Sequence, residues 1–156
     1  MMQRLNGTNP LARYDIATGS TIGCGDLVAL NGEGKAVPAA DTAGLRVIGV
    51  AVDLREGQVE VEVGVFSFAN ASTNGLSRAD RGSVAYVKDK ATLDSVGGTN
   101  KIAAGIVVDV CDGEVYCDVT AAALAAARLL AAAAVAAAVS DSDSGSATAS
   151  GSGTAA

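Results

Sequence analysis

Apolar residues recur at every second position in two short stretches, residues 59–63 (VEVEV) and 115–119 (VYCDV). A period of two predicts a strand with one face buried and one face in water. Each stretch follows a nearly continuous apolar run, at residues 47–54 and at residues 102–110. Such a run is expected of a strand that is covered on both faces. The pattern therefore predicts two β-hairpins.

The turns of these hairpins carry the residues that a tight turn requires. Glu56-Gly57 separates the first pair of strands, and Asp112-Gly113 separates the second pair. A two-residue turn of type I′ needs a positive φ at both central positions, which glycine adopts without steric cost. Asp-Gly between two apolar runs is a strong local signal for a hairpin.

The two predicted hairpins resemble each other in sequence. The stretch 45–66 has a copy at residues 101–119, and when Gly49 is placed on Gly105 the two align without a gap as far as Val63 and Val119. The identical pairs are Val52/Val108, Asp53/Asp109, Gly57/Gly113, Val59/Val115 and Val63/Val119. An internal repeat of this kind fixes the architecture of a chain. It implies that one unit is built from two related halves.

The match continues more weakly upstream, where residues 26–37 lie over residues 82–93 at the same offset. We therefore expect an all-β fold, a small β-barrel or sandwich of two pseudo-repeated hairpin units, residues 26–63 and 82–119. The segment 76–82 is expected to be an exposed helical turn or loop, and residues 88–100 are expected to form a loop.

Composition divides the chain into four parts. Residues 1–20 contain the breakers Asn-Gly and Asn-Pro and predict an N-terminal arm, and residues 21–119 form the β body. Residues 120–139 are rich in alanine, the best helix former, and predict a helix about 28 Å long. Residues 140–156 are a low-complexity Ser/Gly/Ala segment, which predicts a flexible tail.

The alanine-rich helix is long enough to raise the question of a membrane span. Thr120 precedes it and is a suitable N-cap. Arg128 lies near its middle, where an arginine costs about 2.5–3.5 kcal/mol of insertion free energy and alanine offsets little of it. The sequence therefore favours a helix that docks on the body or bundles with copies of itself, and no membrane partner is expected.

The charge and the residue types exclude several classes of function. The chain of 156 residues has 11 Lys and Arg against 17 Asp and Glu, a net charge of −6, so no nucleic-acid partner is expected. It has no histidine, which removes the commonest general base and the commonest metal ligand. The sequence thus predicts a protein that is not an enzyme and that binds no metal and no cofactor.

The cysteines and the paired carboxylates have structural interpretations. Cys117 shares the parity of the buried strand positions, and Cys111 lies opposite Glu114, so a disulfide between them is not expected. An odd cysteine count without a secretory signal fits synthesis in a reducing cytoplasm. Asp53 and Asp109 occupy equivalent positions but lack the turn sequence of aspartic proteases, so we interpret them as solvent-facing carboxylates.

Three residues of the predicted arm are candidate contacts with a neighbouring subunit or a larger surface: Leu11, Arg13 and Tyr14. Arginine and tyrosine are enriched at the centres of protein interfaces. A frayed chain end is the alternative interpretation, because it is the usual state of a terminus.

The order of motifs in the β body resembles a known family. The chain contains GDLVAL (25–30), IGVA (48–51), GVF (64–66), GSVAY (82–86) and AGIVV (104–108) in that order. This pattern is similar to that of the bacteriophage capsid cement or head decoration proteins, small all-β proteins once mislabelled as recombinase-like.

The resemblance covers residues 21–119 and implies a structural role. Members of the family bind the exterior of icosahedral heads, commonly as homotrimers, and hold neighbouring major capsid proteins together. The resemblance therefore implies two partners, the major capsid protein and the chain itself, and a place on the outside of the virion after synthesis in the host cytoplasm. The alanine-rich helix and the tail depart from the usual short form.

Two other functions are compatible with the sequence. One is a head-fibre or surface-adhesion module that binds carbohydrate or the host cell surface, although aromatic residues, which usually carry sugar recognition, make up only 3% of the chain. The other is a carrier or accessory β domain. A carrier would need a modifiable lysine at a hairpin tip, and neither predicted turn contains one.

Overall fold

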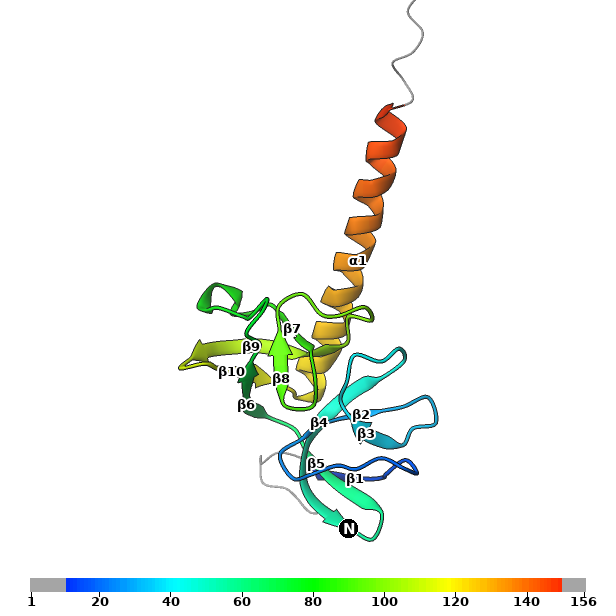
Figure 1. Cartoon of the computed structure of the whole chain (residues 1–156), viewed down its shortest axis with the longest axis vertical. Coiled ribbons are helices and arrows are strands. Elements are labelled where there is room, and N and C mark those ends of the chain that lie inside the picture. The colour runs from blue at the N-terminus through cyan, green and yellow to red at the C-terminus, as the bar shows by residue number, and fades with distance from the viewer. Residues whose placement is uncertain (1–10, 150–156) are drawn as a thin grey trace, which may run out of the picture.

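The computed structural model describes the backbone of residues 11–149 and the side chains of residues 12–138 (Figure 1). In chain order the elements are β1 (Leu11–Asp15), β2 (Leu27–Leu30), β3 (Ala36–Pro38), β4 (Arg46–Arg55), β5 (Gln58–Glu62), β6 (Val65–Asn70), the 3-10 helix η1 (Arg78–Asp80), β7 (Val84–Val87), β8 (Thr92–Asp94), β9 (Ala103–Cys111), β10 (Glu114–Asp118) and α1 (Ala121–Ala149). The predicted all-β body followed by a C-terminal helix is confirmed.

The strands form two five-stranded units. In the first unit the strand order is β1-β5-β4-β2-β3, and in the second unit strands β10-β6-β8-β7-β9 form a closed barrel. The neighbouring strands of the first unit are all antiparallel, while the barrel closes through one parallel pair, β6 with β8. A single parallel bridge, Ile16 with Ala36, joins the two ends of the first unit.

Both predicted hairpins are present with the predicted turns. β4 pairs with β5 around Glu56-Gly57, whose φ angles are 45° and 80°. β9 pairs with β10 around Asp112-Gly113, whose φ angles are 52° and 79°. Positive φ at both central residues is the conformation of a type I′ turn, which matches the twist of the flanking strands.

Each hairpin contains a glycine that allows two backbones to approach closely. Gly49 has a φ of 148°, and a Cβ atom there would lie 2.6 Å from the Glu62 carbonyl oxygen. Gly105 has a φ of 156°, and a Cβ atom there would collide with the Asp118 carbonyl oxygen and with Cys117 Sγ, at 2.7 Å. Both positions therefore require glycine, because a side chain would be strained and would have no space.

The structure differs from the sequence prediction at three segments. Residues 11–15, assigned to an arm, form β1 and pair with β5, while residues 1–10 lie outside the described residues. The stretch 45–66 is not one hairpin, because β5 ends at Glu62 and the residues from Val65 form β6 of the second unit. The predicted loop 88–100 contains the short strand β8.

Two clusters of buried residues form most of the core: one lies inside the first unit, and the other joins the first unit to the barrel. The smaller cluster lies within the first unit, where Tyr14 packs against it; its buried members are Ile22, Val28, Ala36, Ala51, Val59 and Val61. The larger cluster joins barrel residues such as Phe68 and Val115 to Leu27 and Val47 of the first unit. Because strands β2 and β4 contribute to both clusters, both of their faces are covered, and for β4 this agrees with its nearly continuous apolar run.

Helix α1 begins at the predicted N-cap and docks on the barrel. The Thr120 hydroxyl accepts a hydrogen bond from Ala123 N (3.3 Å), and its carbonyl accepts one from Leu124 N (2.8 Å). Ala127 and Ala131 are buried against Tyr86 of β7 and against β9. Beyond these turns the helix leaves the body (Figure 1). It continues to Ala149, so the predicted flexible tail is wrong for the backbone of residues 140–149, and residues 150–156 lie outside the described residues.

We expect Gly49→Ala and Gly105→Ala each to lower the free energy of unfolding by about 1–3 kcal/mol, because each forces a strained φ and a collision with a backbone oxygen. Urea unfolding followed by circular dichroism measures the change. Gly32→Ala is the matched control, since a Cβ atom at Gly32 meets nothing within 4 Å. Equal stability of all three variants would contradict the role assigned to the close approach.

Candidate functional site

The three predicted contact residues lie on β1, an edge strand of the first unit. Leu11 pairs with Glu62 through the backbone, and its side chain lies outside the described part. Tyr14 is half-buried and packs against the smaller cluster, so it is mainly a core residue. Arg13 is exposed, and its Nε donates to a Glu60 carboxylate oxygen at 3.1 Å. Of the three, Arg13 is therefore the side chain that the structure shows available to a partner.

An edge strand is itself a binding surface, because its outer backbone groups can pair with a strand from another chain. β1 lies at the end of the sheet order, and the bridge from Ile16 to Ala36 begins only after the strand has ended. Residues 11–15 thus present one backbone edge. This edge lies at the end of the molecule opposite α1 (Figure 1).

The two equivalent carboxylates are held by different arginines. Arg55 Nε donates a hydrogen bond to Asp53 at 2.7 Å, and this bond lowers the pKa of Asp53 below its ordinary value. A hydrogen bond from Leu54 N makes the next largest contribution to the lowered pKa. Asp109 lies 3.5 Å from Arg78 Nε and 3.8 Å from an Arg81 nitrogen. Both aspartates are half-buried and each takes part in ion pairs, which is the ordinary environment of a salt-bridged carboxylate near a protein surface.

The cysteines are free thiols with different environments. Cys117 is buried, and burial raises the pKa of its thiol to about 12, with a smaller contribution from Asp118. The hydrogen bond and charge of Asp112 raise the pKa of Cys111, which pairs with Glu114 as the sequence predicts. Cys24 is exposed. A raised pKa lowers the thiolate fraction, so neither Cys111 nor Cys117 is an activated nucleophile. Among the described residues no group of His, Cys, Asp and Glu is arranged to hold a metal ion.

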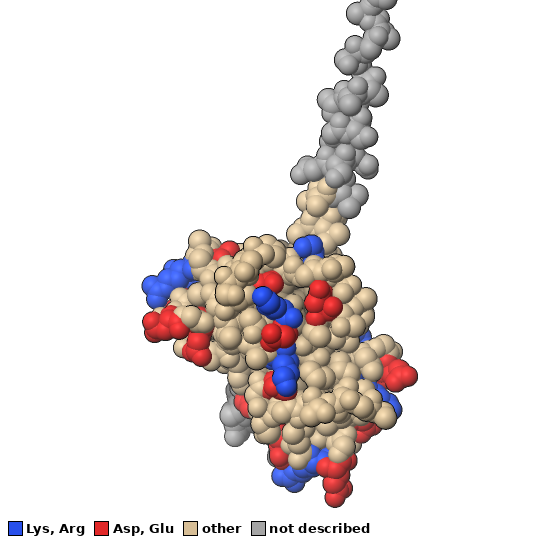
Figure 2. All heavy atoms as spheres, in the orientation of Figure 1, with Lys and Arg blue, Asp and Glu red and all other residues tan. Residues whose placement is uncertain are grey.

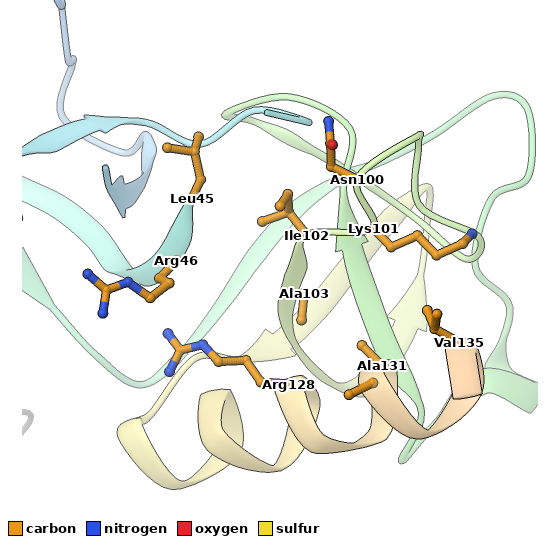
Figure 3. A pocket seen from close by; sticks show the side chains of 10 residues that line it. Leu45, Arg46, Asn100, Lys101, Ile102, Ala103, Arg128, Ala131 and Val135 are labelled. Carbon is orange, nitrogen blue, oxygen red and sulfur yellow. The ribbon is translucent and has the colours of Figure 1, made fainter. Parts of the chain in front are cut away.

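A groove runs between α1 and the body, with a volume of about 400 Å³ (Figure 3). Its floor is largely apolar and includes Ile102 and Val135. Three basic side chains line it, Arg46, Lys101 and Arg128, and no acidic side chain of residues 12–138 does. The groove is therefore positively charged on a molecule whose net charge is −6.

The three basic groups of the groove differ in their partners. Arg128 Nη2 donates to the Val47 carbonyl oxygen at 2.6 Å, which fastens α1 to β4. Burial, and next the charge of Arg46, lower the pKa of the Arg128 guanidinium. Lys101 Nζ donates to the Val96 carbonyl oxygen at 2.7 Å. The Arg46 backbone pairs with Leu30 of β2, and its guanidinium has no hydrogen-bond or ion-pair partner among the described residues. Sequence reasoning missed this groove, because Arg46 and Arg128 are 82 positions apart and share no motif.

Helix α1 also contains the one segment of the described chain that is long and apolar enough to cross a membrane, residues 121–138, of which 22% is buried inside the protein. The buried part is the part docked on the barrel, with Leu124 at 3% and Ala127 at 0% exposure. In Figure 2 the described part of the projecting stem is largely uncharged, while acidic and basic side chains are interspersed over the body.

No family model, no curated protein and no solved structure matches this chain. Two surfaces of the described chain are open to a partner, the β1 edge and the groove beside α1.

The thiol environments predict an order of reactivity. In the folded protein at mildly alkaline pH we expect an aromatic disulfide reagent to modify Cys24 first, Cys111 more slowly, and Cys117 only after unfolding, because Cys117 is buried and its pKa is raised. Mass spectrometry of the labelled peptides over time measures the order. Fast labelling of Cys117 in the native protein would contradict the buried environment.

Proposed function

We propose that this chain is a structural protein of a bacteriophage head, one that binds the outer surface of the shell and stabilises contacts between major capsid proteins. In this proposal it is not an enzyme, and it is part of the virion exterior after synthesis in the host cytoplasm. Its partners are the major capsid protein and further copies of itself, with the homotrimer that the family resemblance implies.

The observation that carries this proposal is that the two ends of the molecule differ. Strand β1, which contains Arg13, lies at one end of the molecule, and α1 projects from the other end (Figure 1). A protein attached by the first end would display the helix away from the surface. Decoration proteins stabilise a shell by binding only its assembled state, and the gain in free energy grows with the concentration and affinity of the bound copies.

The chemistry of the polar groups supports a binding role. Asp53 and Asp109 are ion-paired, and Cys111 and Cys117 have raised pKa values. They are among the groups from which a histidine-free chain would draw an acid, a base or a nucleophile. The lowered pKa of Asp53 and the raised pKa values of Cys111 and Cys117 favour a charged carboxylate and protonated thiols over proton transfer or nucleophilic attack.

We also propose that the two β units are duplicated copies, as the internal sequence similarity predicts. If β1–β5 are matched to β6–β10, both units have the same order of neighbouring strands. The register skips one residue between Ala51 and Asp53, and again between Val107 and Asp109, at positions that match in the two copies. This correspondence supports copies that run from β1 to β5 and from β6 to β10, longer than the predicted units 26–63 and 82–119.

A membrane-spanning role for α1 is disfavoured by the docking of its first turns. The helix is fastened to the body as far as Ala131, and the sequence turns polar at Ser140. About eight apolar residues therefore remain free, against the roughly 20 that a span requires. Insertion into a membrane would expose Leu124 and Ala127, which are buried against the body, and would break the Arg128 hydrogen bond to Val47.

The alternative function is a head-fibre or surface-adhesion module that binds carbohydrate or the host cell surface. Sugar recognition usually uses exposed aromatic rings. Here Phe68 and Tyr86 are buried, Tyr14 packs against a core, and Tyr116 is exposed to 38%. This distribution favours the capsid role over the adhesion role.

The test is co-sedimentation of the purified chain with undecorated heads of the phage that encodes it. We expect the wild-type chain to bind, and Arg13→Ala to weaken binding about tenfold or more, since a desolvated interface arginine commonly contributes this much. Arg55→Ala is the matched control, because Arg55 is also an exposed arginine of the first unit paired with a carboxylate.

Two outcomes would contradict the proposal at different levels. Failure of the wild-type chain to bind heads would contradict the function. Equal binding of the Arg13 and Arg55 variants would contradict the role of the β1 edge while leaving the function in place.

A further inference from the structure

We propose that the groove beside α1 is a docking site for a second copy of this chain, whose α1 enters it antiparallel and brings the aspartates of residues 140–143 (SDSD) to Arg46 and Arg128. This contact is separate from the proposed capsid function and does not depend on it. It uses a surface at the helix end of the molecule, away from the β1 edge.

The first argument is the unbalanced charge of the groove. Figure 3 shows the side chains of Arg46 and Arg128 extending toward the same side of the groove. Their mutual repulsion contributes to the lowered pKa of Arg128. The Arg46 guanidinium has no hydrogen-bond or ion-pair partner among the described residues, and no carboxylate of residues 12–138 lines the groove. Two adjacent guanidinium groups over an apolar floor fit a carboxylate-bearing segment, because arginine binds carboxylates with paired hydrogen bonds.

The second argument is that the chain supplies such carboxylates but cannot place them in its own groove. Asp141 and Asp143 follow on the same continuous helix as Arg128. Fifteen residues of helix separate Arg128 from Asp143, a rise of about 22 Å. A straight helix therefore keeps these aspartates away from its own Arg128, and only another copy can bring them there.

The third argument is the pattern along α1. Arg128, Ala132, Val135, Val139 and Asp143 follow one another at spacings of three or four residues, which places these positions along one side of a helix. An antiparallel pairing that sets Arg128 opposite Asp143 also sets Ala132 opposite Val139. The pattern is thus self-complementary about a two-fold axis, the symmetry of most homo-oligomers.

The same pattern disfavours a parallel bundle of helices. Parallel packing would place Arg128 beside Arg128 and Asp143 beside Asp143, and both contacts are repulsive. Antiparallel packing makes both contacts attractive. It also covers Val135, which is 46% exposed in the single chain. The two bodies then lie at opposite ends of the helix pair, so a three-fold contact between bodies uses a different surface.

The test is the molar mass of the full chain in solution, measured by sedimentation velocity over a series of concentrations. We expect the double variant Arg46→Glu/Arg128→Glu to have half the molar mass of the wild type. We expect the quadruple variant, which adds Asp141→Arg and Asp143→Arg to the double variant, to have the wild-type mass again. In that variant each pairing once more joins opposite charges. The control is Arg55→Glu/Arg81→Glu, which changes the net charge equally on exposed arginines outside the groove.

Because Arg128 also fastens α1 to β4, Arg46→Glu alone is the second variant, and we expect it to shift the same equilibrium toward the smaller species. An unchanged mass for both groove variants would overturn the proposal. Loss of pairing that the aspartate replacements fail to restore would overturn it as well, since another segment would then occupy the groove. Groove variants that leave the mass unchanged but lose binding to heads would also overturn it and would assign the groove to the capsid protein.

Discussion

The shape of both β units depends on a close backbone approach at one glycine in each long strand. At Gly49 the backbone of β4 lies against the Glu62 carbonyl of β5, and at Gly105 the backbone of β9 lies against the Asp118 carbonyl of β10. Irregular register next to these glycines bends the long strands more than a regular ladder would. The bent strands let each five-stranded sheet curl around a core, whereas flat strands would not enclose one.

Helix α1 lies on an apolar face of the barrel that the first unit does not cover. In the first unit Leu27 and Val47 are buried in the cluster shared with the barrel. In the second unit Val84 and Ala103 lie in the cluster that contains Ala127 and Ala131 of α1. The helix therefore covers an apolar face of the barrel, and small alanine side chains let it lie close to the strands. Beyond Ala131 the described side chains of the helix, residues 132–138, are exposed.

Much of the fold could be predicted from local chemistry. Alternating apolar residues, a glycine after an acidic residue at each turn, and a threonine before an alanine run specified both hairpins and the start of α1. Two features could not be predicted in this way. Among the described strands β1 pairs only with β5, which lies more than 40 residues away in sequence, and β8 is three residues long and joins the distant β6 to its neighbour β7. The helix continues past Ser140, where composition alone favoured a tail.

The candidate site shows the same division. The sequence predicts Arg13 as a contact because arginine is enriched at the centres of interfaces, and the structure places its exposed side chain on the edge strand β1. The groove beside α1 joins Arg46 at the start of β4 to Arg128 in the helix, and only the docking of α1 brings them together. Arg128 therefore has a structural partner in the Val47 carbonyl, which explains an arginine within an alanine run without reference to a membrane.

Cryo-electron microscopy of heads incubated with the purified chain tests the central claim most directly. The account predicts density for the β body on the outer surface of the shell, with the β1 edge against the major capsid protein and α1 pointing away from it. Density that places α1 against the shell and the β1 edge outward, or heads that carry no added density, would contradict it.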